Sequence, residues 1–111
     1  MNKQKELENK VIEICENLGW WVNVYAQEFE NRFFEIGQPS PLGEDFSFNA
    51  WGDSIIQDIK KYASDFDAEA HAVMWYEREA WRGLRNLLND ADAIQEMLYE
   101  LAEAVANLEV E

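Results

Sequence analysis

Apolar residues recur with two different periods along this chain, and the change of period separates helices from strands. Leu7, Val11 and Leu18 follow helical spacing, and Gly19 stands where a helix commonly ends. This pattern predicts a helix over about residues 3–18. From Trp20 the period falls to two, which is typical of a strand.

Three short segments alternate apolar and polar residues and are predicted to be strands. They cover about residues 20–27, 32–37 and 45–50. Residues 38–43 contain two prolines and a glycine, which predicts a turn between the second and third strands. Connections this short favour an antiparallel meander.

Helical spacing returns in the second half of the chain. Asp53 is the predicted N-cap of a helix that stops near residue 64, and Asp67 the predicted N-cap of one that runs to about Arg82. The last predicted helix spans about residues 84–108 and has a heptad seam. The seam consists of Leu84, Leu87, Ala91, Ile94, Leu98, Leu101, Val105 and Leu108. It could serve a coiled-coil dimer, but we favour packing inside the chain because three other helices are available.

The order of these elements predicts an α+β fold in one domain over residues 1–111. An N-terminal helix is followed by a three-stranded antiparallel sheet and then by three helices packed mainly on one sheet face. Apolar residues make up 48% of the chain and aromatic residues 14%, so an acidic disordered tail is excluded.

The net charge limits the classes of partner. The chain has 23 acidic and 9 basic residues, a formal net charge of −14. Such a field repels phosphate, so we expect neither direct nucleic-acid binding nor binding to an anionic membrane. The expected partner is a basic protein, in particular one that itself binds nucleic acid. The alternative is that the acidity only keeps the protein soluble.

The sequence predicts a cytoplasmic location. Cys15 is the only cysteine, so no disulfide can form within the chain. The N-terminus is polar and predicts no signal peptide, and no apolar run is long enough to span a membrane.

Candidate catalytic and metal-binding residues are few. The only histidine, His71, would have to serve every catalytic proposal, and neither a nucleophile elbow nor a glycine-rich phosphate loop is present. We therefore expect no enzyme activity, no cofactor and no metal site. A structural position beside aromatic side chains is the preferred interpretation of His71.

Two surfaces are candidates for binding a partner. On the last predicted helix, four acidic residues share one stripe opposite the heptad seam, with no lysine between them: Asp92, Glu96, Glu100 and Glu103. Their spacing of about 6 Å per four residues is comparable to that of phosphates along a DNA strand. The alternative is an ordinary solvated helix face.

The second candidate is the sheet face turned away from the helices. Alternation places Trp21, Tyr25 and Phe33 there with Glu35, whereas Val24 and its alternating neighbours should face the helices. Exposed aromatics among polar residues favour a protein contact or a homodimer. The alternative is that another segment covers this face.

A third group is basic and aromatic. Arg78, Arg82 and Arg85 lie close in sequence to Trp75 and Trp81. Internal ion pairs or cation–π contacts are the expected explanation.

Three segments resemble a loosely defined family of small acidic bacterial proteins found in phages and conjugative elements. They are residues 40–48, 65–75 and 88–98, within a match over about 21–104. The family's last helix opens on Gly-Val-Pro-Ser, whereas residues 83–86 here are Gly-Leu-Arg-Asn. The resemblance implies a genetic context and transfers no catalytic residue.

Mobile elements often encode small acidic inhibitors of host defence, including anti-restriction and anti-CRISPR proteins that imitate DNA in charge. The resemblance and the acidic stripe together lead to the hypothesis of an inhibitor that binds a basic nucleic-acid-handling target. The alternative hypothesis is an assembly module that dimerises through the aromatic sheet face or the heptad helix.

Overall fold

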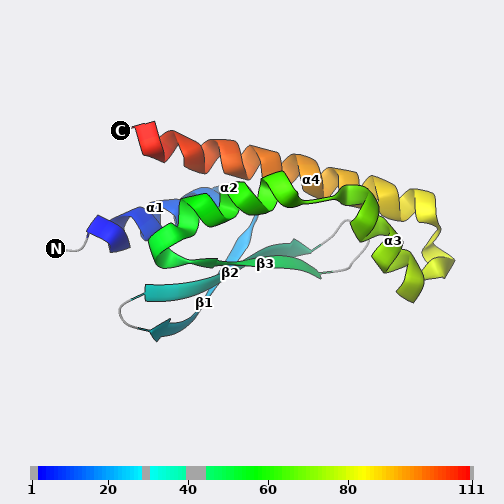
Figure 1. Ribbon diagram of the computed structural model, residues 1–111, viewed down its shortest axis with the longest axis horizontal. Helices are drawn as coiled ribbons and strands as arrows, with labels where there is room; N and C mark the ends of the chain where they lie inside the picture. Colours follow the sequence, from blue (N-terminus) through cyan, green and yellow to red (C-terminus); the bar gives the residue numbers. More distant parts are fainter. Residues whose placement is uncertain (1–2, 29–30, 40–44, 111) are drawn as a thin grey trace.

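The computed structural model describes residues 3–28, 31–39 and 45–110, and it confirms the predicted α+β class (Figure 1). An N-terminal helix precedes an antiparallel sheet, and helices form the remainder of the described chain. The helices are α1 (Lys3–Asn17), α2 (Ile55–Asp65), α3 (Ala68–Arg78) and α4 (Leu84–Ala106), the strands are β1 (Trp21–Glu28), β2 (Asn31–Pro39) and β3 (Asp45–Trp51), and short 3-10 turns are η1 (Gly52–Ser54), η2 (Ala80–Arg82) and η3 (Asn107–Val110).

The strands form the predicted meander, with β2 in the centre. Trp21 pairs with Gly37 and Val24 pairs with Phe34 across β1 and β2, and Phe34 pairs with Ala50 of β3. Beyond Val24 the β1–β2 register shifts, as at a β-bulge. Because the pairing is in register over most of its length, alternate residues of all three strands share one face.

The predicted turn over residues 38–43 is wrong at its beginning, because Gln38 and Pro39 continue β2 and pair with β3. β1 begins opposite Gly37, so these two residues have a strand partner on one side only. Proline lacks a backbone N–H and is tolerated at such a position. Residues 40–43 of this predicted turn lie outside the described residues.

The helices pack on one face of the sheet in two layers. α1 and α2 contact the sheet, and α4 lies along their other side, so that the sheet and α4 occupy opposite long sides of the molecule (Figure 1). Every layer contributes side chains without exposed surface, among them Val11, Ile36, Ile59 and Leu98. These residues belong to one connected hydrophobic core.

The heptad face of α4 is buried within the chain, as favoured from the sequence. Leu87, Leu98 and Val105 have 0% exposed surface, while Leu84 at the start of the seam is 40% exposed. The partners of this face are α1, α2 and α3. The described part of α4 therefore leaves no seam for a coiled-coil dimer.

Two predicted helix ends are confirmed. Gly19 follows α1 with a φ of 91°, a left-handed conformation that glycine adopts without strain. The backbone N–H of Trp20 reaches back to the Cys15 carbonyl oxygen at 2.8 Å. Asp67 caps α3, since its Oδ1 accepts the Ala70 backbone N–H at 3.1 Å.

The predicted cap of α2 is wrong. α2 begins only at Ile55, after the turn η1 that contains Asp53. Asp58 instead reaches back, accepting the Trp51 backbone N–H at 2.9 Å and the Ser54 hydroxyl at 3.0 Å. A carboxylate one turn into a helix can thus replace a side-chain cap.

The third helix is shorter than predicted. α3 stops at Arg78, Glu79 leaves helical geometry, and η2 carries the chain through Arg82 to Gly83. Gly83 has a φ of 84°, so the turn into α4 uses a conformation open to glycine. α4 ends at Ala106, two residues before the predicted end.

Val24 was expected to be covered by the helices, but 48% of its surface is exposed. Its assignment to the helix-side face holds, because it pairs with the fully buried Phe34. β1 is an edge strand, and the helix layer covers the central strand more completely than this rim. Val22, which lies nearer the start of β1 and pairs with Ile36, is partly buried against the core.

Candidate partner-binding surfaces

The predicted acidic stripe exists as a set of exposed side chains on α4. Asp92, Glu96, Glu100 and Glu103 are all exposed, and the opposite side of the helix is embedded in the core. Within the described chain, none of the four carboxylates makes a hydrogen bond or an ion pair. The stripe therefore presents unneutralised charge from a helix that cannot rotate.

Nearby basic residues do not relieve this charge. Residues 86–111 contain no lysine or arginine. Lys60 of α2 reaches the far end of the chain, but there its Nζ pairs with Glu109 Oε1 at 2.8 Å. Tyr99 stands beside the stripe with 52% of its surface exposed. Like charges one turn apart cost a few tenths of a kcal/mol per pair, so α4 tolerates this repulsion for no gain in stability.

The second predicted surface also exists, because the described chain leaves the outer sheet face open. Tyr25 is 54% exposed and Trp51 is 39% exposed. The register arranges the outward residues in three rows across the strands. The nine outward positions are Trp21, Asn23 and Tyr25 on β1, Phe33, Glu35 and Gly37 on β2, and Ser47, Asn49 and Trp51 on β3. We call these nine residues the open sheet face.

Glu35 occupies the centre of the open sheet face and is its only charged member. The Tyr25 hydroxyl donates a hydrogen bond to Oε1 at 2.5 Å, and the Ser47 hydroxyl donates one to Oε2 at 2.7 Å. These donors, Tyr25 first and Ser47 second, lower the pKa of Glu35 below its ordinary value. The same contact raises the pKa of Tyr25, because the phenol donates to a carboxylate. The carboxylate is thus ionised and held in one orientation.

Aromatic rings flank Glu35 along the strands. On one side the Trp21 indole covers Gly37 so closely that a Cβ there would lie 2.5 Å from the ring carbon Cζ2. On the other side Phe33 meets Trp51 edge to face at 4.7 Å between ring centroids. Trp51 was missed from the sequence because the third strand was ended at Ala50, although continued alternation places residue 51 outward.

The two candidate surfaces do not meet. The stripe of Asp92, Glu96, Glu100 and Glu103 points away from the core on one side, and Glu35 with its aromatic neighbours points away on the other. The helices α1 and α2 lie between them (Figure 1). A partner that covers one surface leaves the other free unless it wraps around the domain.

A third exposed apolar area was not predicted. Trp81 in η2 is 82% exposed, and Val73, Met74 and Tyr76 on α3 are 41–49% exposed. The sequence prediction for this stretch concerned its arginines, which were expected to form internal ion pairs or cation–π contacts. That part of the prediction holds for Arg82, which is buried, pairs with Glu79 at 2.8 Å and lies 5.9 Å from the Trp81 ring.

The residues with catalytic or metal-binding chemistry are placed in packing roles. His71 stacks on Phe66 at 4.4 Å and meets Trp75 at 5.9 Å between ring centroids, as interpreted from the sequence. Burial raises the pKa of the Cys15 thiol to about 12. Among the residues with described positions, no three His, Cys, Asp or Glu side chains converge to hold a metal ion, and no helix is both long and apolar enough to cross a membrane.

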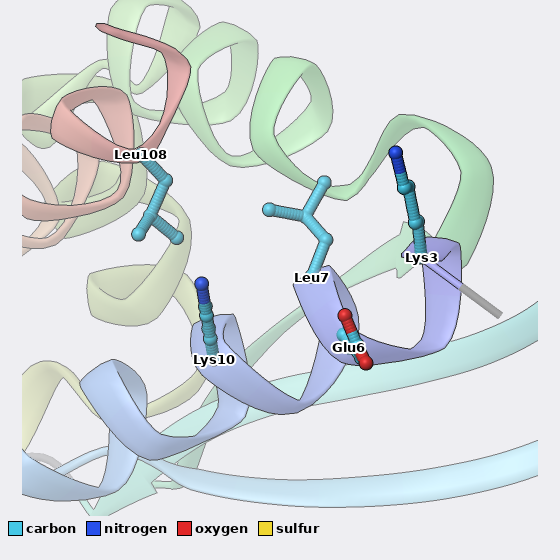
Figure 2. A pocket seen from close by; sticks show the side chains of 5 residues that line it. All are labelled: Lys3, Glu6, Leu7, Lys10 and Leu108. Carbon is cyan, nitrogen blue, oxygen red and sulfur yellow. The ribbon is translucent and has the colours of Figure 1, made fainter. Parts of the chain in front are cut away.

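A small hollow of about 260 Å³ lies between α1 and the end of the chain. Figure 2 shows Leu7 and Leu108 facing each other across it, with Lys3 and Lys10 projecting from α1 on either side. The lining mixes two ammonium groups, two aliphatic side chains and the carboxylate of Glu6.

Comparisons with protein-family models, with curated protein sequences and with solved structures found no match. The two surfaces therefore have to be interpreted from their own chemistry.

Proposed function

We propose that this protein is a non-catalytic inhibitor that binds a basic, nucleic-acid-handling protein, with the carboxylates of α4 occupying positions where that target binds phosphates. The observation that carries the proposal is the exposed row of Asp92, Glu96, Glu100 and Glu103, none of which is paired within the described chain. A solvated helix face usually mixes charges of both signs, and this one does not.

The rigidity of α4 supports this function. Leu87, Leu98 and Leu101 fix the inner side of the helix with 0% exposure. The outer carboxylates rise by about 6 Å for every four residues, comparable to the distance between neighbouring phosphates on one strand. A target that binds phosphates with lysine and arginine would meet charges already at a suitable spacing.

The net charge of −14 adds a long-range contribution. It accelerates encounter with a basic surface and disfavours nucleic acid itself. Because screening shortens this range from about 10 Å at 0.1 M salt to about 3 Å at 1 M, the complex should weaken strongly with added salt.

The test separates the layout of the charges from their number. A panel of basic nucleases and other DNA-binding proteins is mixed with fluorescent DNA, and the release of DNA by this protein is followed by anisotropy. The stripe variant Glu96→Lys/Glu100→Lys is compared with Glu13→Lys/Glu16→Lys on the exposed side of α1, which changes the net charge equally.

We expect the unmodified protein and the α1 variant to displace DNA from the same member of the panel. The stripe variant should be weaker by at least about tenfold. Equal potency of the two variants would reduce the effect to bulk charge and contradict the proposal, as would failure to displace DNA from any target.

A further inference from the structure

The open sheet face is a second candidate binding surface, separate from the acidic stripe and different in its chemistry. Its central carboxylate, Glu35, is surrounded by Trp21, Tyr25, Phe33 and Trp51. A carboxylate in an aromatic surrounding is the arrangement that binds organic cations, because ring faces attract positive charge and the carboxylate neutralises it. We propose that the open sheet face binds the guanidinium group of an arginine presented by a partner protein.

The positions of the rings favour a planar cation. Phe33 and Gly37 are the outward neighbours of Glu35 on β2, each about 7 Å along the strand. The Trp21 indole covers Gly37, so that aromatic surface borders Glu35 in both directions along the strand. A guanidinium group can stack on such rings while its N–H groups point to a carboxylate, which a lysine ammonium cannot do in the same way.

The hydrogen bonds of Glu35 leave acceptor capacity for an arginine. An ionised carboxylate has about four acceptor sites, two on each oxygen. Tyr25 uses one site on Oε1 and Ser47 uses one on Oε2. The Asn23 side chain is a further, weaker donor to the same carboxylate. The remaining acceptor capacity is open to an arginine, whose parallel N–H groups match the two carboxylate oxygens.

The chain itself provides no cation for this carboxylate within its described part. Arg32 points to the helix side and binds Glu8, and Lys61 at the sheet's edge pairs with Asp65 at 2.7 Å. Charge complementarity therefore identifies the occupant as a cationic side chain from outside.

The same carboxylate argues against a second copy of this chain as the occupant. In a twofold interface each surface meets itself, so Glu35 at the centre would lie near the Glu35 of the other copy. Two carboxylates would then lose water without a counter-charge, which is unfavourable. An arginine removes this cost and uses the aromatic area as well.

The experiment uses the full chain and short peptides with one arginine. Matched peptides carry lysine or the neutral isostere citrulline at that position. Binding is followed through the tryptophan indole N–H signals in NMR spectra, with those of Trp21 and Trp51 assigned by substitution. Site-specific signals are needed because any cationic peptide will be attracted to a chain of charge −14.

We expect the arginine peptide to shift the Trp21 and Trp51 signals. Its affinity should be at least about tenfold higher than that of the citrulline peptide, and also higher than that of the lysine peptide. Glu35→Gln should lower the affinity for the arginine peptide by a similar factor. Glu13→Gln, on the exposed side of α1 and outside both candidate surfaces, removes the same charge and should leave the binding nearly unchanged. Ser47→Ala, which removes only one orienting hydroxyl, should give an intermediate loss.

Three results would overturn the proposal. The first is equal affinity for the arginine and citrulline peptides, and the second is an equal loss of affinity in Glu35→Gln and Glu13→Gln. The third is self-association through the open sheet face. It would be detected as a concentration-dependent shift of the Trp21 and Trp51 signals together with a dimer in sedimentation. None of them bears on displacement of DNA by the α4 stripe, so the two proposals fail separately.

Discussion

The buried carboxylate of Glu8 on α1 accepts a hydrogen bond from Arg32 Nε on β2 at 2.5 Å. The Glu8 side chain is 3% exposed and that of Arg32 is 18% exposed. Gln4 also donates to Glu8 Oε2, at 3.0 Å, and the same amide donates to the Gly52 carbonyl oxygen. Arg32 lies over the Phe34 ring as well, at 5.1 Å. This cluster ties the N-terminal helix to the central strand and to the turn before α2.

Arg32→Ala should destabilise the fold substantially, because Glu8 would keep its buried charge and lose its counter-charge. Breaking a buried pair from one side costs about 3–5 kcal/mol, and the partial exposure of Arg32 places the expected loss near the lower end. The measurement is chemical denaturation followed by circular dichroism. Lys61→Ala removes an exposed ion pair with Asp65 and should cost no more than about 0.5 kcal/mol. Similar losses of stability in the two variants would show that the Glu8–Arg32 pair stabilises the fold no more than an exposed ion pair does.

Gly37→Ala should disturb the open sheet face and the fold together. A Cβ at this position would lie 2.4 Å from the Phe46 carbonyl oxygen and 2.5 Å from the Trp21 ring. The oxygen belongs to the backbone of β3 and cannot move aside without breaking the sheet. We expect a loss of about 1–3 kcal/mol and a changed Trp21 indole signal. At Gly19→Ala a Cβ meets nothing within 4 Å, so only the left-handed backbone should be penalised, by about 1 kcal/mol, with the Trp21 signal unchanged.

The sequence predicts the fold well because its hydrophobic periods are consistent over whole elements. The seam from Leu87 to Val105 specifies both the helix and its buried side, and the alternation in β2 places Phe34 and Ile36 in the core. The misplaced boundaries depend on single contacts instead. Asp53 was predicted as the cap from its residue type, but the turn η1 delays the helix to Ile55, and Asp58 one turn later accepts the Trp51 backbone N–H instead.

The candidate surfaces are predictable in part for the same reason. Alternation assigns Trp21, Tyr25, Phe33 and Glu35 to one face, and the structure brings them together. The alternation pattern alone does not predict the hydrogen bond from Tyr25 to Glu35, which lies diagonally across the strands. A side-chain hydrogen bond depends on rotamers and, in this case, on the register shift beyond Val24. The exposed apolar area around η2 escaped prediction because no period distinguishes a short turn from a continued helix.

The thiol of Cys15 should be unreactive in the folded protein. Burial chiefly, with a smaller effect of Glu16, raises its pKa from 9.0 to about 12. A thiol reagent at mildly alkaline pH should label it only after unfolding in guanidinium chloride, and rapid labelling of the native chain would contradict its buried position.

The pH dependence of stability follows from the same raised pKa. The unfolded thiol ionises above about pH 9 while the folded thiol stays neutral, so this contribution is fully present below pH 9 and is lost as the pH rises toward 12. Three pKa units correspond to about 4 kcal/mol. Denaturation curves over this range should fall more steeply for the unmodified protein than for Cys15→Ala, which has no thiol to ionise. Parallel curves for the two proteins would show that Cys15 makes no such contribution.

Tyr25→Phe should raise the pKa of Glu35 toward its ordinary value of 4.5, because the Tyr25 hydroxyl is the main cause of the lowered pKa. The lowered pKa means that the carboxylate's contribution to stability is present above the ordinary value and is lost as the pH falls through the folded pKa. The raised pKa of Tyr25 gives the opposite pH dependence, because the contribution of Tyr25 to stability is lost as the pH rises above 10. The Glu35 pKa can be followed directly by NMR titration of its side-chain carboxyl carbon. Ser47→Ala should give a smaller rise, since the Ser47 hydroxyl is the second contributor. An unchanged Glu35 pKa in Tyr25→Phe would mean that the hydroxyl does not hold the carboxylate in solution, and the open sheet face would then lack the fixed charge on which guanidinium binding depends.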